Sequence, residues 1–382
     1  MTGPQPRATR ALTRTGGAIM AGELFIDVAG MNSVYNQLQR GVDAADEAVA
    51  HIERHCSLSR VQQGLIVQML TPHEVAYAEM TGALTRLRSL TQGTATQVNG
   101  AQVGYSQEDL RTAATLDSRY EGAASPDVLA SELAQERLRL PTVHSGFADV
   151  QEPGAHLVAP RNPQAEFWAF NPAVDLLSPF AYLRQAAIWV FSHDPFELWT
   201  EWFAGDWDSY IKAGMAMEHA GSAAGAIADN LAAGAVALPA VWRGNAAEHF
   251  QEYELELAKA ARSLRELGAN FNTLYQQSAE CVKNFYEVFS GFIVKMFDAL
   301  LMVSIGLAGG SAMIATFAGA VVGFSVALTY AIYAAELYKK ISDAYTHSEN
   351  ALKAIAGTAA AQRASADLTD LPAIQPYQHP GN

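Results

Sequence analysis

Apolar residues recur every seven positions along two long stretches of the chain. The first repeat consists of Tyr210, Met217, Ala224, Leu231 and Leu238, and the second of Phe250, Leu257, Leu264 and Phe271. Because a seven-residue repeat places its members along one face of a helix, each stretch predicts a long helix with an apolar stripe. Pro239 and Gly244 interrupt the helical pattern between the two stretches. We therefore expect an antiparallel hairpin that turns at Trp242-Arg243-Gly244 and serves for packing.

The first third of the chain repeats the same pattern. Residues 23–120 begin with an apolar seam made of Met31, Leu38, Ala45 and Ile52. A connection around residues 57–71 leads to Pro72, which suits a helix start, and to a second apolar series of Met80, Leu84, Leu87 and Leu90. The pattern weakens over residues 91–104, which are polar and contain glycine. The sequence predicts a second helical hairpin here.

The fold that these patterns predict is all-α. Each hairpin has apolar seams that it cannot hide alone, so the two hairpins are expected to associate within one chain as a four-helix bundle. The predicted divisions are a disordered tail (1–22), the first hairpin (23–120), a Pro-rich linker (121–165), a Trp-rich connector (166–204), the hairpin around Trp242 (205–291), a hydrophobic helical hairpin (292–340), and a helix end with a disordered tail (341–382).

The connector of residues 166–204 is unusually aromatic, and Trp207 follows it. Its tryptophans are Trp168, Trp189, Trp199 and Trp202. Such residues suit a membrane interface, and they suit a core plug that joins two domains equally well. Because the stretch is acidic, with Arg184 as its cation, the plug is the favoured interpretation.

Residues 292–338 form the second strong hydrophobic signal. No charged residue occurs from Ser311 to Ala335, and a helix of that length would span roughly 37 Å, enough to cross a bilayer. Gly319 and Gly323 would allow close helix packing. The hairpin either inserts into a membrane or is shielded by the other helices, and the absence of charge favours insertion. Lys339 and Lys340 would then favour the cytoplasmic face.

Composition and charge exclude several classes of partner. The net charge of −14 argues against nucleic acid and anionic lipid, and only 17% of the residues are charged. Cys56 and Cys281 continue apolar seams and are expected to be small core residues, although a bridge between them is left open.

The common catalytic and metal-binding motifs are absent from the sequence. His51 and His55 lie beside Cys56, but that cysteine belongs to the apolar seam, so we expect solvated histidines rather than metal ligands. The sequence has no P-loop, HExxH, G-x-S-x-G or CxxC motif. We expect no enzyme activity, no cofactor and no bound metal.

Two short motifs carry a resemblance to a known family. Trp242-x-Gly244, between heptad helices and preceded by the stretch 205–210 (GDWDSY), resembles the WXG-motif family of type VII (ESX) secretion substrates. Residues 195–301 resemble the helical delivery module of actinobacterial secreted toxins. Tyr105 and Asp109 resemble the Tyr-x-x-x-Asp/Glu element that follows the helical hairpin in these substrates, and residues 23–120 resemble the small EspC-like or PE-like hairpins.

The resemblance implies a function in secretion. Tyr105, Asp109, Trp242 and Gly244 would meet at one end of the bundle, as in fused PE–PPE-like proteins, and form a composite export signal for the secretion ATPase. Trp242 would stack at the turn and Gly244 would permit the chain reversal. The protein would be secreted or held in the cell envelope, with a small WXG-family protein or a second copy as a further partner. The alternative is a membrane-anchored helical scaffold or pore component, held by residues 292–338.

Overall fold

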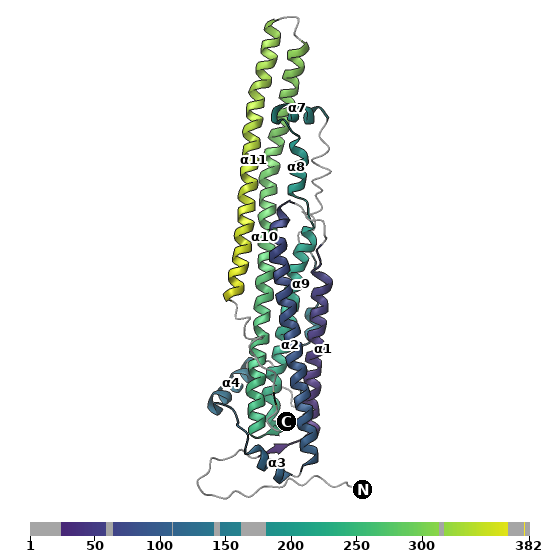
Figure 1. Cartoon of the computed structure of the whole chain (residues 1–382), viewed down its shortest axis with the longest axis vertical. Helices are drawn as coiled ribbons and strands as arrows, with labels where there is room; N and C mark the ends of the chain where they lie inside the picture. The colour runs from purple at the N-terminus through teal and green to yellow at the C-terminus, as the bar shows by residue number, and fades with distance from the viewer. Residues whose placement is uncertain are drawn as a thin grey trace.

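The computed structural model describes residues 24–58, 64–108, 110–140, 146–161, 181–312, 317–365 and 378. Among them, five long helices define an elongated all-α molecule (Figure 1), which confirms the predicted fold class. These helices are α1 (Val28–His55), α2 (Val67–Gln107), α9 (Trp207–Ala237), α10 (Asn245–Ala312) and α11 (Phe317–Ser365). The predicted N-terminal tail of residues 1–22 lies outside the described residues.

Shorter elements connect the long helices. The helices are α3 (Leu110–Asp117), α4 (Pro126–Arg139), α7 (Ala181–Phe191) and α8 (Pro195–Trp202), with 3-10 turns η1 (Gly64–Ile66), η2 (Pro153–His156) and η3 (Leu238–Ala240). Two strands of two residues each, β1 (Phe25–Ile26) and β2 (Trp242–Arg243), pair antiparallel, with Ile26 opposite Trp242. This pairing ties the start of the first hairpin to the turn of the second.

The core lies where α1, α2, α9 and the first half of α10 pack together. All four residues of the predicted seam on α10 are buried, namely Phe250, Leu257, Leu264 and Phe271. Helices α9 and α10 approach closely because glycine replaces larger side chains at the contact. A Cβ on Gly221 would lie 2.5 Å from the carbonyl oxygen of Leu264, and one on Gly268 would lie 2.4 Å from that of Met217. The heptad stripes therefore bury each other.

Helix α2 is longer at both ends than the pattern predicted. It begins at Val67, so Pro72 lies inside the helix rather than at its start. The buried residues Leu65, Ile66 and Met69 hold this added turn in the core. Residues 91–104 are also helical. Thr91 and Thr94 donate their hydroxyl hydrogens to the carbonyl oxygens of Leu87 and Leu90, which satisfies these two polar side chains in the core.

Two predicted divisions fall inside continuous helices. Helix α10 runs for 68 residues through the division at 291/292, because its packing against α11 follows directly on its packing against α9. Helix α11 likewise continues past residue 340 to Ser365. The linker of residues 121–165 contains α4 and η2, and both pack against α9.

Candidate functional site

The turn between α9 and α10 requires glycine at position 244. Gly244 has φ +136°, a conformation that side chains with a Cβ rarely adopt. An added Cβ would also lie 2.6 Å from Oδ2 of Asp117. The chain reversal expected at Gly244 is present, and Asp117, from the first half of the chain, limits the space for a side chain at this position.

Asp117, the last residue of α3, caps the start of α10. Its Oδ2 accepts a hydrogen bond from the backbone N–H of Asn245 at 2.9 Å, and its Oδ1 accepts one from Ala246 at 3.1 Å. The side chain of Asn245 returns the contact by donating to the carbonyl oxygens of Asp117 and Tyr120, at 3.2 and 3.0 Å. A buried carboxylate at a helix N-terminus satisfies free N–H groups and complements the helix dipole. Sequence reasoning missed Asp117.

Tyr105 and Trp242 meet at this same end of the bundle. Their rings lie 6.1 Å apart, edge to face, and the ring of Phe250 lies 5.7 Å from Trp242 on α10. Burial raises the pKa of the Tyr105 phenol, with Asp117 and Tyr120 adding to the effect. The structure thus brings Tyr105, Trp242 and Gly244 together, whereas Asp109 lies outside the described residues.

Trp242 contributes almost nothing to the exposed surface at this end of the bundle. Trp242 is only 1% exposed, so it supports the turn from below. Arg243 beside it is exposed, and its guanidinium lies 4.6 Å from the ring centre of Phe25, a cation–π contact. A partner that approaches this end would meet Arg243, Phe25 and the half-buried Tyr105.

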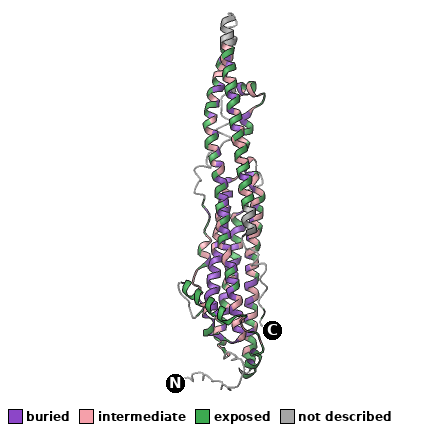
Figure 2. Cartoon of the chain, turned by 90° about the vertical axis from the view of Figure 1, so that its left-hand side faces the viewer, coloured by how far each residue is buried: buried purple, intermediate pink, exposed green. Residues whose placement is uncertain are grey.

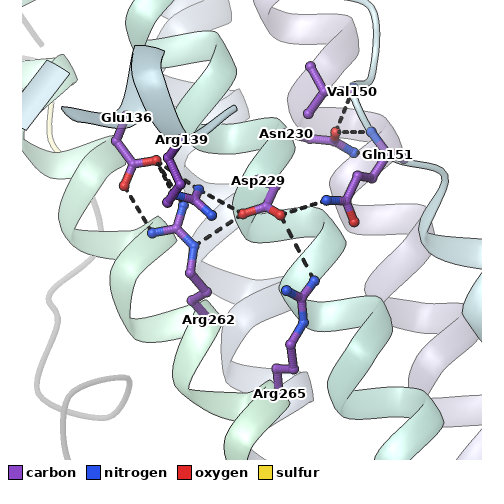
Figure 3. A network of polar contacts seen from close by, with 8 residues as sticks. All are labelled: Glu136, Arg139, Val150, Gln151, Asp229, Asn230, Arg262 and Arg265. Carbon is purple, nitrogen blue, oxygen red and sulfur yellow. Dashed lines mark hydrogen bonds and ion pairs between the residues drawn. The ribbon is translucent and has the colours of Figure 1, made fainter. Parts of the chain in front are cut away.

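A buried ionic network fastens the segment that follows α3 to the bundle (Figure 3). Asp229 on α9 is almost fully buried and accepts hydrogen bonds from Arg139, Arg262 and Gln151 at 2.8, 3.1 and 2.8 Å. Glu136 on α4 binds Arg262 through both of its oxygens, at 3.0 and 3.1 Å. Residues expected to form an irregular linker are therefore held against α9 and α10 by paired charges.

The neighbouring Asn230 holds the backbone of this segment. Its Oδ1 accepts hydrogen bonds from the backbone N–H groups of Val150 and Gln151 at 2.9 and 3.1 Å, and its amide donates to the carbonyl oxygen of Gln151 at 2.9 Å. The Asn230 side chain therefore makes hydrogen bonds with this backbone of the kind that a neighbouring β-strand would make.

The histidines next to Cys56 are not both solvated. His51 is 2% exposed, and its ring lies 4.7 Å from that of His55 and 5.8 Å from that of His219 on α9. Burial, with the positive neighbours His55, His219 and Arg54, lowers the pKa of His51 to about 4. The prediction failed because His219 comes from a distant part of the sequence. No group of three potential ligands in the described part of the chain could hold a metal ion.

The two cysteines do not form a bridge. Cys56 is buried, as expected, and burial raises the pKa of its thiol to about 12, whereas Cys281 is half-buried and lies on α10. The carbonyl oxygen of Cys56 contacts Nε2 of His73 at 2.9 Å, and Nδ1 of His73 contacts the Tyr275 hydroxyl at 2.6 Å. This chain of contacts joins the two hairpins in the core.

Three tryptophans of the connector region are buried against the long helices. Trp202 stacks on Tyr345 of α11 with ring centres 4.2 Å apart, Trp199 packs against Phe289 of α10 at 5.6 Å, and Trp207 is 2% exposed. These three act as the plug that their composition favoured. Trp189 on α7 differs, since it is 51% exposed, and Trp168 lies outside the described residues.

The far half of the α10–α11 hairpin extends beyond the bundle and has many exposed residues (Figure 2), and apolar side chains are among them. The large exposed ones are Val288, Val294, Leu301, Ile305, Phe324, Leu328, Ile332 and Tyr333. Gly306 packs against Ala327, where an added Cβ would lie 2.7 Å from the backbone nitrogen. Gly323 is half-buried on the same hairpin, and the side-chain position of Gly319 lies outside the described residues.

Two helical stretches of the described chain are long and apolar enough to cross a membrane. In Pro195–Ala240, which covers α8 and α9, 83% of the most apolar window is buried, so this window belongs to the core of the bundle; in Asn245–Ala308, only 33% is buried. Comparison with models of protein families, with curated proteins and with solved structures gives no significant match.

Proposed function

We propose that this protein is a non-enzymatic substrate of a type VII secretion system, exported through a composite signal of Tyr105, Asp109, Trp242 and Gly244. The observation that carries the proposal is the contact between Tyr105 and Trp242, which unites the two motifs of the resemblance from separate hairpins. Both motifs resemble the secretion-substrate family by sequence alone, and this resemblance does not require them to be neighbours in space.

The geometry supports a signal that exists only in the folded chain. Trp242 is buried beneath the turn, Tyr105 borders it, and Asp117 fixes the start of α10. A secretion ATPase that recognises this end would contact Tyr105 and Arg243, while Trp242 and Gly244 support the turn beside them.

Export by a strain with and without its type VII ATPase tests the proposal. The wild-type chain should reach the culture medium only with the ATPase, and Trp242→Ala, Tyr105→Ala and Asp109→Ala should each reduce export at least tenfold. Trp189→Ala, on α7 and far from the turn at Trp242, is the matched aromatic control and should be exported normally. Normal export of folded Tyr105→Ala and Asp109→Ala proteins would overturn the proposal, and circular dichroism of the purified variants establishes their folding.

The exposed apolar hairpin supports a second candidate function, that of a membrane-anchored scaffold or pore component. Its outer face carries large apolar side chains at exposures of 40–61% on α10. Contact with lipid would remove this surface from water at a gain of roughly 25 cal/mol per Å². Recovery from cell membranes only with detergent supports this function, and recovery of all the protein in the soluble fraction contradicts it.

A further inference from the structure

The tip of the α10–α11 hairpin carries no charge on any side. The sequence has no Asp, Glu, Lys, Arg or His between residues 299 and 335. Among the described residues of the tip, the buried ones are Ala299, Leu300, Val303, Gly306, Ala327 and Ala334, and Gly306 of α10 packs against Ala327 of α11. A helix that packs against one protein partner keeps a polar face toward water, whereas one that is apolar all round is surrounded by core or by lipid. The large apolar side chains described on the tip, such as Ile305 and Leu328, are exposed, so lipid is the surrounding that its chemistry fits.

Two hydroxyl groups of the tip are satisfied within the helices. The hydroxyl of Ser304 donates to the carbonyl oxygen of Leu300, and that of Thr329 to the carbonyl oxygen of Ser325, each at 2.9 Å. An unsatisfied hydroxyl would cost several kcal/mol in hydrocarbon, and these internal bonds avoid that cost.

The length of the tip matches most of a bilayer. Residues 299–312 of α10 measure about 21 Å and residues 317–335 of α11 about 28 Å, compared with about 30 Å for the hydrocarbon core. Local thinning of the bilayer accommodates a difference of this size. Charged residues begin at the base of the tip on both helices: Asp298 and Lys295 on α10, and Glu336, Lys339 and Lys340 on α11. Both helices therefore enter from the same side.

A short helix lies across the hairpin at that base (Figure 1). Helix α7 packs Leu183, Ala186 and Ala187 against the long helices and exposes Ile188 and Trp189, at 40% and 51%. Its end contacts α11 just beyond Glu336, where the rings of Phe191 and Tyr338 lie 4.8 Å apart. Its one charged residue, Arg184, is ion-paired with Asp194. Exposed tryptophan on a transverse apolar helix is typical of a lipid–water interface.

We propose that the helical segments 299–312 and 317–335 insert into a lipid bilayer from one side and that α7 lies in the interface of the leaflet first entered, with Ile188 and Trp189 among the headgroups. This inference rests on the second candidate function and is independent of the export signal. Because the chain has a net charge of −14, burial of apolar surface rather than attraction to anionic lipid drives insertion. Zwitterionic vesicles should therefore suffice, and salt should have little effect.

Flotation with phosphatidylcholine vesicles tests insertion. The full chain should float with the vesicles, and the double variant Ile305→Asp/Leu328→Asp should lose at least nine-tenths of this binding. The matched control is Val128→Asp/Leu138→Asp, which places two charges at exposed apolar positions of α4 and should float like the wild type. Failure of the wild type to float, or equal flotation of both double variants, overturns insertion.

Depth-dependent quenching then tests the position of α7. In a Cys56→Ala/Cys281→Ala background, single cysteines at positions 305, 189 and 252 carry an environment-sensitive fluorophore. Nitroxides deep in the acyl chains should quench position 305 most, headgroup nitroxides should quench position 189 most, and neither should quench position 252. A floating protein whose label at 189 stays unquenched overturns the role of α7 and leaves the membrane function standing. Export of the same protein into the medium is scored separately, so failure of one proposal does not imply failure of the other.

Discussion

The carboxylate of Asp117 accepts a hydrogen bond from the backbone N–H of Asn245 at 2.9 Å, although 128 residues separate the two in sequence. This contact joins the end of the first hairpin to the first turn of the longest helix. The turn at Trp242 is therefore held by residues from both halves of the chain.

Removing this cap should destabilise the bundle. Asp117→Ala leaves the N–H groups of Asn245 and Ala246 without their buried acceptor, and we expect the free energy of unfolding to fall by about 1–2 kcal/mol. Urea denaturation followed by circular dichroism measures the change. Asp127→Ala, which removes an exposed carboxylate from the first turn of α4, should change it by less than about 0.5 kcal/mol.

Substitution of Gly244 should be costly for two reasons. Gly244→Ala forces an alanine into φ +136° and brings its Cβ against Asp117, so we expect a loss of about 1–3 kcal/mol. Gly291→Ala on α10 is the control, because its Cβ would meet no atom within 4 Å and alanine favours helix. Equal melting temperatures for the two variants would contradict the geometry of the turn.

Buried Glu254 should make the protein less stable as the pH rises. Neither carboxylate oxygen has a hydrogen-bond partner among the described residues, and burial raises the pKa well above 4.5. The folded state holds this proton more tightly than the unfolded state, so stability is greatest below the unfolded pKa and falls as the pH climbs toward the folded pKa. Glu254→Gln should flatten the fall in melting temperature above pH 5, whereas Glu256→Gln, at the exposed neighbouring position, should leave it unchanged.

His51 should have the opposite pH dependence. Its pKa in the folded state is about 4, below the ordinary 6.5, so protonation favours the unfolded chain. The stability linked to this residue is complete above pH 6.5 and is lost as the pH falls toward 4. Thermal melts from pH 7 to pH 4 should show a smaller loss for His51→Gln than for the wild type. His347→Gln on the exposed side of α11 should behave as the wild type does.

The ionic network of Asp229 should decide whether α4 stays on the bundle. Arg139→Ala removes one partner of Asp229 and one of Glu136, so we expect α4 to detach more often and trypsin to cleave residues 126–161 several times faster. Arg137→Ala, at an exposed position of the same helix, is the control. Unchanged cleavage of the Arg139 variant would show that apolar contacts, such as that of Leu129, suffice to hold the segment.

The helices with strong seven-residue repeats could be predicted because their pattern is local. Phe250 and Leu257 share a face whatever the rest of the chain does, so the hairpin and its turn followed from spacing alone. The polar end of α2 could not be predicted in the same way, since Thr91 and Thr94 are acceptable in a core only once their hydroxyls bond to the helix backbone.

The details of the site depend on contacts between residues that are far apart in the sequence. The spacing of Tyr105 and Asp109 suggested a motif, but nothing near Asp117 marks it as a cap for a helix that begins 128 residues later. His51 was expected in solvent for the same reason, because the ring that encloses it belongs to α9. The helices could therefore be predicted from the sequence, whereas the contacts between distant segments could not.

Helix α10 is continuous over 68 residues, a rod of about 100 Å. One extremity of this rod is the corner under Asp117, and the other is the uncharged tip. A protein that binds the turn leaves the tip free, so one end of the molecule can be bound while the other enters a different environment. Stiffness then becomes the means of transmission: a tilt of a few degrees at the bound end displaces the tip by several ångströms.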